Sequence, residues 1–388
     1  MLRRQHIWQI DWFLVAITVS ILLIGAAFVW SASYYSRAGG EGYYHSMYRT
    51  QFIWFGLGVV ACIAMVILDY HKLLKFADAF YLFGIVLLIV VLANVVTDRF
   101  RWIRLGPVRF QPSEFMKIAI ILLLAKYVPT GEQLKTFRGW IVPIILSSCP
   151  LLLILRQPNL ATAVVIVPVV LAVLFVAGAR PKHFIILGLV CLTAAPVGWY
   201  SLKEYQKHRV VSFVWKGKGD SHAEMNELYQ IIQAETAVGA GGWFGRGWGK
   251  GTQNRLNFLP RGTKPTDFIM AVIAEEAGFI GACSVLLLFF ILFLGCLGIA
   301  DQTRDPQGKA IVVGVVALLA TQVFVNAGVA TGLLPTTGIP MPFVSYGGSS
   351  TLASFMMLGL VINVGLRRSS FLAGGDRSEL KPLRRVLK

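Results

Sequence analysis

Charged residues are scarce in this sequence of 388 residues, and acidic residues are scarcer than basic ones. Only 14% of the residues are charged, whereas a soluble domain usually carries about 25%. This shortage excludes an ordinary soluble protein. Cysteines are also few, and the five present are scattered through apolar stretches without the paired spacing of a metal or redox motif. We expect them to be packing residues.

Two further patterns are missing. The stretch 242–251 alternates glycine with aromatic and basic residues, but it has neither Walker nor dinucleotide-binding spacing, which disfavours a nucleotide site. Such a backbone suits close packing against a ligand or, equally, an interfacial loop with its tryptophans at the headgroup level. No internal repeat supports a transporter or a flippase, although prolines within the apolar runs leave transport possible.

Long apolar runs dominate what is present: 56% of the residues are hydrophobic and the mean hydropathy is +0.67. Runs of about 20 residues, the length that crosses a bilayer as a helix, recur along the chain. They predict an all-α, polytopic integral membrane protein with a single domain over 1–388 and a large loop at 202–267. The ten predicted spans are 12–30, 51–68, 77–96, 114–128, 140–155, 160–178, 184–201, 268–300, 310–330 and 350–366.

An even number of spans places both termini on one side of the membrane. The tail 367–388 is rich in Lys and Arg, and the connections on the same side are short and basic, so we expect both termini to be cytoplasmic. The first span is too long for the apolar region of a signal peptide, which has about 7–15 residues. The opposite, outer side then carries the segments 31–50, 97–113, 202–267 and 331–349.

Basic residues are more frequent on this outer side than orientation alone explains, in a chain of net charge +17. The segment 97–113 holds four arginines: Arg99, Arg101, Arg104 and Arg109. Arginine binds phosphate and diphosphate groups through paired hydrogen bonds. Long basic side chains that reach ordinary anionic lipid are the alternative, and composition does not separate the two.

Acidic residues within apolar runs give sharper predictions, because a charge in a membrane is costly unless it is paired or hydrated. Glu114 and Lys117 are three residues apart and share one face of a helix, either as an interfacial ion pair or as part of a site. If a helix starts near Asp267, Glu275 lies about 12 Å along its axis. That separation exceeds the spacing of the two carboxylates in a glycoside hydrolase and disfavours one.

Several sequence blocks, spread over nearly the whole chain, occur in the order typical of one family. They are Arg101-Trp102-Ile103, Phe110-Gln111-Pro112-Ser113-Glu114, Arg156-Gln157-Pro158, Gly251-Thr252-Gln253, Asn257-Phe258-Leu259-Pro260, Thr266-Asp267-Phe268-Ile269, Leu334-Pro335 and Thr337 to Ser350. The sequence thereby resembles the SEDS family of shape, elongation, division and sporulation proteins. Ile10-Asp11-Trp12 and the blocks at 251–253 and 257–260 resemble the elongation members more than the division members.

The resemblance implies a peptidoglycan glycosyltransferase of the bacterial cytoplasmic membrane that polymerises lipid II into glycan strands. It also implies a class B penicillin-binding protein and other elongation-complex proteins as partners, and no nucleic acid. The family's essential acidic residue corresponds to Asp267. A role for Asp267 as the N-cap of the following helix is the structural alternative. The functional alternatives are a flippase for lipid-linked precursors and the division-specific role.

The implied reaction needs a base for the acceptor hydroxyl and groups that stabilise a departing diphosphate. Direct displacement inverts the anomeric centre. Asp267 is the predicted catalytic base, and a divalent cation, Mg²⁺ or Mn²⁺, is possible. The predicted substrate-binding residues are Arg101, Arg109, Glu114, Lys117, Lys250, Gln253, Ser345 and Ser349.

The chain departs from the family pattern in two places. Asn159 stands where an aspartate is usual, which puts in doubt any role that needs a carboxylate there. The segment 261–265 before Thr266 is longer and more basic than usual, so the position of Asp267 is not fixed by the resemblance.

Overall fold

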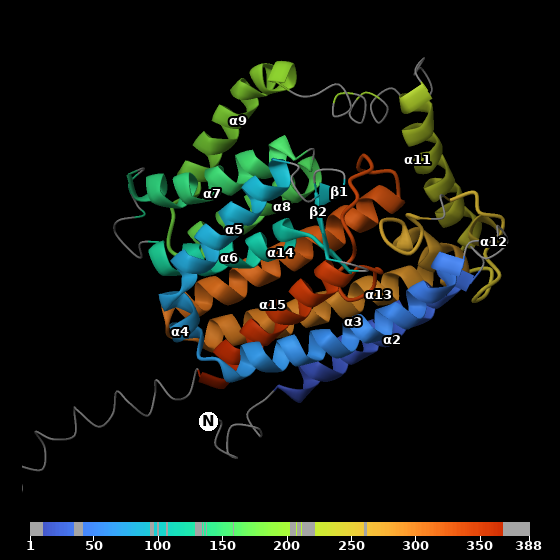
Figure 1. Ribbon diagram of the computed structural model, residues 1–388, viewed down its shortest axis with the longest axis horizontal. Helices are drawn as coiled ribbons and strands as arrows, with labels where there is room; N and C mark the ends of the chain where they lie inside the picture. The colour runs from blue at the N-terminus through green and yellow to red at the C-terminus, as the bar shows by residue number, and fades with distance from the viewer. Residues whose placement is uncertain are drawn as a thin grey trace, which may run out of the picture.

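The computed structural model describes residues 11–34, 42–93, 97–98, 101–105, 108–128, 134, 136, 138–157, 159–201, 207, 211, 222–259 and 262–367. Within these residues the chain is a bundle of long helices (Figure 1). Each predicted span overlaps one of these helices. These helices are α2 (Trp12–Tyr34), α3 (Gly42–Ile67), α5 (Ala77–Leu92), α6 (Pro112–Tyr127), α7 (Arg138–Arg156), α8 (Leu160–Val176), α9 (Pro181–Ser201), α13 (Ile269–Gln302), α14 (Pro306–Ala330) and α15 (Gly348–Arg367).

Six helices in the described part are long and apolar enough to cross a membrane, and α5 and α8 are shorter apolar helices. The predicted all-α, multi-pass membrane fold is confirmed. The described part also contains α11 (His222–Gly241), which has 20 residues, and the short helices α4 (Tyr70–Lys75) and α12 (Thr252–Arg255). Helix α4 lies at one end of the bundle, while α11, α12 and the small sheet lie toward the other (Figure 1). We call these the α4 end and the Asp267 end.

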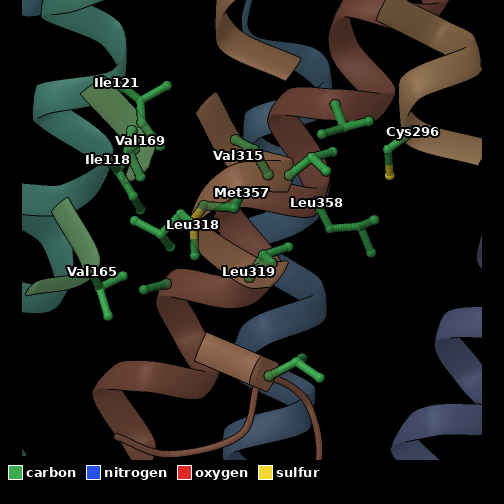
Figure 2. Packing of buried hydrophobic residues seen from close by; sticks show 14 of the residues in the cluster. Ile118, Ile121, Val165, Val169, Cys296, Val315, Leu318, Leu319, Met357 and Leu358 are labelled. Carbon is green, nitrogen blue, oxygen red and sulfur yellow. The ribbon is translucent and has the colours of Figure 1, made fainter. Parts of the chain in front are cut away.

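Helix α14 forms the centre of the bundle and packs against α6, α8, α13 and α15. Side chains from these helices interdigitate in one core, with Ile118 and Ile121 of α6 facing the α14 residues Val315 and Leu318 (Figure 2). Helix α6 is buried along almost its whole length. By contrast, α2, α3 and α5 expose many large apolar side chains, as helices that face lipid do. Polar groups on α6 and α14 are therefore shielded from lipid by other helices.

A three-stranded antiparallel sheet replaces the loop expected in the segment 97–113. Its strands are β1 (Thr97–Asp98), β2 (Trp102–Leu105) and β3 (Val108–Phe110), with β2 in the middle. Ile103 pairs with Phe110 and Arg104 pairs with Arg109. Phe110 stacks on Phe115 of α6, with 4.7 Å between the ring centroids. This contact holds the β2–β3 hairpin over the first turn of α6.

Helix α13 is broken at Gly278, where a single continuous span was expected. The backbone of Gly278 has φ 72° and ψ −171°, a conformation that glycine adopts far more readily than other residues. The segment 242–247 supplies hydrogen-bond partners for the backbone groups of α13 that the break leaves without helical partners. Arg246 N and Gly247 N donate to the carbonyls of Glu275 and Glu276 at 3.0 and 2.9 Å.

On the other side of the break, Phe279 N and Ile280 N donate to Gly242 O and Trp243 O at 2.8 and 3.1 Å. A broken helix in a membrane is tolerated when its free backbone groups find such partners. The glycine-rich stretch therefore packs closely against α13 of its own chain. Residues 279–302 still span about 36 Å at roughly 1.5 Å per residue, which is enough to cross the bilayer.

Candidate functional site

Asp267 lies in the turn just before α13, at the end of the bundle that is named after it. Its side chain is half-buried. Three hydrogen bonds fix the backbone around it. Ser345 Oγ donates to Thr266 O at 2.6 Å, and Tyr346 N donates to Pro265 O at 2.8 Å. Asn326 Nδ2, from α14, donates to Asp267 O at 3.0 Å. The position of this carboxylate is thus set by α14 and by the segment 341–346.

The structure does not support the N-cap alternative for Asp267. Helix α13 begins at Ile269, its N-cap residue is Phe268, and no side-chain hydrogen bond caps it among the described residues. The Asp267 N–H instead donates to Thr263 O at 2.9 Å, within the preceding turn. An acidic side chain at this position is therefore not explained by helix capping.

Ser345 and Ser349, both predicted to bind substrate, contact backbone groups. The Ser345 hydroxyl also accepts a hydrogen bond from Met341 N at 2.8 Å. The Ser349 hydroxyl accepts from Gln111 N at 3.1 Å and donates to Arg109 O at 3.3 Å. The two serines are four residues apart, no more than about 14 Å along the chain. They join the Asp267 turn to the β2–β3 hairpin, and their role in substrate binding stays a prediction.

The hairpin presents two arginines side by side. Arg104 and Arg109 are direct cross-strand partners, so they lie on the same face of the sheet, and both are exposed. Like charges directly opposite one another destabilise a strand pair, and an anion bound between them would remove that cost. Arg101, half-buried, lies just before β2. Arg104 was absent from the predicted site because its partnership with Arg109 depends on strand register.

Glu114 and Lys117 form the predicted pair inside the protein. Lys117 Nζ lies 2.9 Å from each carboxylate oxygen of Glu114, and the side chains are only 5% and 2% exposed. Both belong to the first two turns of α6, directly after Gln111, which Ser349 contacts. The pair therefore lies within two turns of the residue through which Ser349 contacts this part of the chain.

Lys250 lies just before α12 and Gln253 lies within it, close in sequence to the segment 242–247 that closes the break in α13. Lys250 is exposed. Gln253 N donates to Glu275 Oε1 at 2.7 Å, and the buried Gln253 amide oxygen has no hydrogen-bond partner among the described residues. The same holds, within the described part of the chain, for the buried amide oxygens of Gln322 and Asn326, one turn apart on α14. Sequence reasoning missed these two, since single amides inside an apolar run gave no motif.

The departure at Asn159 has a structural explanation. Asn159 is the N-cap of α8, and its side-chain oxygen accepts from Thr162 N at 3.3 Å. Asparagine and aspartate cap helices about equally well. The capping role at this position therefore needs no carboxylate.

Protein ligands for a metal ion are few in the described part of the chain, where no three His, Cys, Asp or Glu side chains are grouped to hold one. Magnesium often binds through only one or two carboxylates, with substrate phosphates and waters completing its shell. The half-buried Asp267 carboxylate fits a role as one such ligand.

Comparison with known proteins decides the family. The family model for FtsW, RodA and SpoVE, described as cell cycle protein, matches residues 11–370. The chain belongs to this family. Stage V sporulation protein E of Bacillus subtilis is 37% identical over 366 residues, which cover 91% of this chain and 96% of that protein. Peptidoglycan glycosyltransferase MrdB of Escherichia coli is 32% identical over 372 residues, covering 94% and 96%.

The probable peptidoglycan glycosyltransferase FtsW of Geobacter metallireducens is 33% identical over 377 residues, covering 94% of this chain and 97% of that protein. Two solved structures are also similar. RodA of Thermus thermophilus, a rod shape determining protein, aligns with a TM-score of 0.66 and 28% identity, covering 92% of this chain and 97% of RodA. A chain from a peptidoglycan synthase complex that coordinates polymerization and crosslinking aligns with a TM-score of 0.76 and 28% identity, covering 92% and 98%.

Proposed function

We propose that this FtsW/RodA/SpoVE-family protein is a peptidoglycan glycosyltransferase that polymerises lipid II into glycan strands. The proposal rests on one observation: the short segment 341–349 contacts both the turn that carries Asp267 and the hairpin that carries the arginine pair. On one side of that segment is the half-buried Asp267 carboxylate, and on the other is the arginine pair of the hairpin. MrdB and FtsW, two relatives of this chain, bear the name of that activity.

The reaction divides between these groups. The Asp267 carboxylate accepts the proton of the acceptor sugar hydroxyl as that oxygen attacks the anomeric carbon of the donor. The bond from this carbon to the diphosphate breaks, and the arginines at 101, 104 and 109 stabilise the charge on the leaving diphosphate. Attack opposite the leaving group inverts the anomeric centre. A divalent cation, when bound, would add further charge stabilisation at the diphosphate.

A class B penicillin-binding protein, which cross-links the strands, is the partner that this function calls for. The similarity to a chain from a complex that coordinates polymerization and crosslinking supports it. The blocks at 10–12, 251–253 and 257–260 favour a role in elongation over the division role of FtsW or the sporulation role of stage V sporulation protein E. Restoration of rod shape, but not of septa or spores, in cells that lack the respective native protein would support this assignment.

The direct test is to supply purified protein, with and without its partner, with lipid II and to measure glycan polymer on a gel. Polymer that depends on Asp267 supports the glycosyltransferase. The flippase alternative predicts no polymer, together with movement of labelled lipid II between the leaflets of protein-containing vesicles, and that pair of results would reject the proposal.

The proposed orientation places the Asp267 end outside the cell and both termini in the cytoplasm. In a variant without native cysteines, single cysteines at the exposed positions Lys250 and Gly262 should react with an impermeant maleimide added to intact cells. A cysteine at Lys75, at the α4 end, should react only after the cells are opened. If only Lys75→Cys reacted in intact cells, and the other two variants did not, the orientation would be the opposite of the proposed one.

A further inference from the structure

A group of buried polar side chains lies beside the break in α13, and the reaction proposed above does not use it. Two acidic residues of α13, Glu275 and Glu276, are 0% and 2% exposed, and the Lys264 side chain, from the turn before Asp267, is 0% exposed. A buried charge is very unfavourable unless it is paired and hydrogen-bonded. The structure shows how these charges are accommodated.

The Asn254 side chain connects the buried anion to the buried cation. Its amide nitrogen donates to Glu276 Oε1 at 2.9 Å, and its amide oxygen accepts from Lys264 Nζ at 3.4 Å. Lys264 Nζ also donates to Asn254 O at 2.9 Å and to Asn257 Oδ1 at 2.7 Å. The orientation of the Asn254 amide is therefore dictated by the carboxylate on one side and the ammonium on the other.

Further contacts fix the carboxylates. Glu276 accepts from Ser31 Oγ of α2 at 2.6 Å and from Gly249 N at 3.0 Å. Glu275 accepts from Gln253 N and Asn254 N at 2.7 and 3.2 Å. The two acids thus hold the loop 249–254 against α13 and α2. Lys264 then connects that loop to the turn that carries Asp267.

The connection from Lys264 to Asp267 runs through the backbone of the neighbouring residue. Thr263, the neighbour of Lys264, accepts hydrogen bonds at its carbonyl oxygen from Asp267 N and Phe268 N, at 2.9 and 3.1 Å. A displacement of Lys264 therefore moves the atom that holds the Asp267 backbone. Misplacement of a catalytic group by about 1 Å can cost roughly 100-fold in rate.

We propose that Glu276, Asn254 and Lys264 form a buried positioning relay that sets the place of Asp267 in the site. The relay does not touch the substrate. It acts through the turn 262–268, which it ties to α2 and to the break in α13. This inference rests on the proposed glycosyltransferase function.

The test compares Glu276→Gln and Lys264→Met with the unaltered protein in lipid II polymerisation. Each substitution removes one buried charge and keeps a similar side-chain length. We expect kcat to fall about 10- to 100-fold, with the KM for lipid II changed by less than about threefold, because no substrate contact is lost. The double variant should be no slower than the slower single variant, since both substitutions act through the same amide.

Asp78→Asn is the matched control, because it disrupts the ion pair of Asp78 with Lys126 near the α4 end. Measured well below each variant's midpoint of thermal unfolding, the control should keep kcat within about twofold. A kcat near that of the unaltered protein in Glu276→Gln would overturn the relay. So would multiplicative losses in the double variant, or a loss in the control as large as that in Glu276→Gln.

Hydrogen exchange supplies a readout that does not depend on activity. In Glu276→Gln, the Asp267 and Phe268 amides should exchange faster while those of α14 keep their protection; unchanged exchange at both amides would contradict the relay. If Lys264→Met fails to fold, Ser31→Ala takes its place, with a smaller loss of kcat expected, because it removes one donor to Glu276 and leaves Lys264 intact.

Failure of the inference is distinguishable from failure of the function. If the unaltered protein forms polymer and Asp267→Asn does not, while Glu276→Gln is normal, only the relay is rejected. If the unaltered protein forms no polymer with its partner, the glycosyltransferase itself is rejected.

Discussion

Both ends of the helix bundle are held together by polar side chains, but they bury those side chains to different extents. At the Asp267 end, Glu114 and Lys117 are 5% and 2% exposed. At the α4 end, Asp78 forms an ion pair with Lys126, and these side chains are 43% and 24% exposed. Exposed ion pairs stabilise a protein by about 1 kcal/mol at most, whereas removal of one partner of a buried pair is strongly destabilising.

The α4 end also contains buried hydrogen-bond donors, among them the phenol of Tyr70. Tyr70 Oη donates to Asp305 Oδ2 at 2.9 Å, and the Asp305 carboxylate caps α14 through the N–H groups of Gln307 and Gly308. Burial and the neighbouring Asp305 carboxylate raise the pKa of the Tyr70 phenol well above its ordinary value, so it stays a donor at any physiological pH. These contacts fix helix ends, while those at the Asp267 end fix a carboxylate. Substitutions at the two ends should therefore differ in kind.

The largest effect is expected at Asp267. Asp267→Asn keeps the size of the side chain but cannot accept a proton, so polymer formation should fall by about 10² to 10⁴. Since Phe268 occupies the N-cap position, Asp267→Ala should lose a similar factor. The measurement is polymer formed per minute at matched protein levels, with lipid II binding retained. Robust polymer from Asp267→Asn would reject the catalytic assignment.

Glu114 and Lys117 come next. Lys117→Ala leaves the Glu114 carboxylate buried without its ammonium, at a cost of about 3–5 kcal/mol in the free energy of unfolding, and it should also impair activity. The readouts are thermal unfolding in detergent and the polymerisation rate of the folded fraction. Full polymerisation by the double variant Glu114→Gln, Lys117→Met would show that the pair serves packing alone.

A smaller effect is expected at the hairpin. Arg104→Gln and Arg109→Gln each remove a charge that is exposed and adjacent to another arginine, so the fold should tolerate them. A charge-assisted hydrogen bond contributes about 1.5–3 kcal/mol, so we expect the KM for lipid II to rise about tenfold. Added salt should raise the KM less in the variants than in the unaltered protein. If the KM depended on salt equally in the unaltered protein and in both variants, Arg104 and Arg109 would not belong to the substrate site.

The smallest effect is expected at the α4 end. Tyr70→Phe removes one hydrogen bond to Asp305, which should lower the free energy of unfolding by about 1 kcal/mol and leave kcat unchanged. Denaturation and polymerisation measured on the same sample check both statements. A loss of kcat beyond about twofold would show that the α4 end communicates with the site, and the contrast drawn above would fail.

The helices were predictable because each follows from local hydropathy, which needs no knowledge of neighbours. The pairing of Arg104 with Arg109 was not, since it depends on the register of a short hairpin. The break at Gly278 was not either, since it depends on contacts with the distant segment 242–247. Gly278 follows the acidic pair Glu275-Glu276 within a long apolar segment, and the backbone contacts of the segment 242–247 make a break there tolerable.

The candidate site was predicted in part. Asp267 and the Glu114–Lys117 pair followed from a family motif and from helical spacing, respectively. Lys264 was counted among the outer basic residues, yet it is fully buried. A lysine in a loop gives no sign in the sequence that oxygens of Asn254 and Asn257 will enclose it.

The attachments of the loop before Asp267 bear on its unusual length. Glu275 and Glu276 hold the loop at Gly249, Gln253 and Asn254, while Ser345 and Tyr346 hold it at Thr266 and Pro265. Residues inserted between Leu259 and Gly262, outside both sets of contacts, would lengthen only the stretch between two fixed points. An insertion there would therefore lengthen the loop without displacing the contacts that hold the backbone of Asp267.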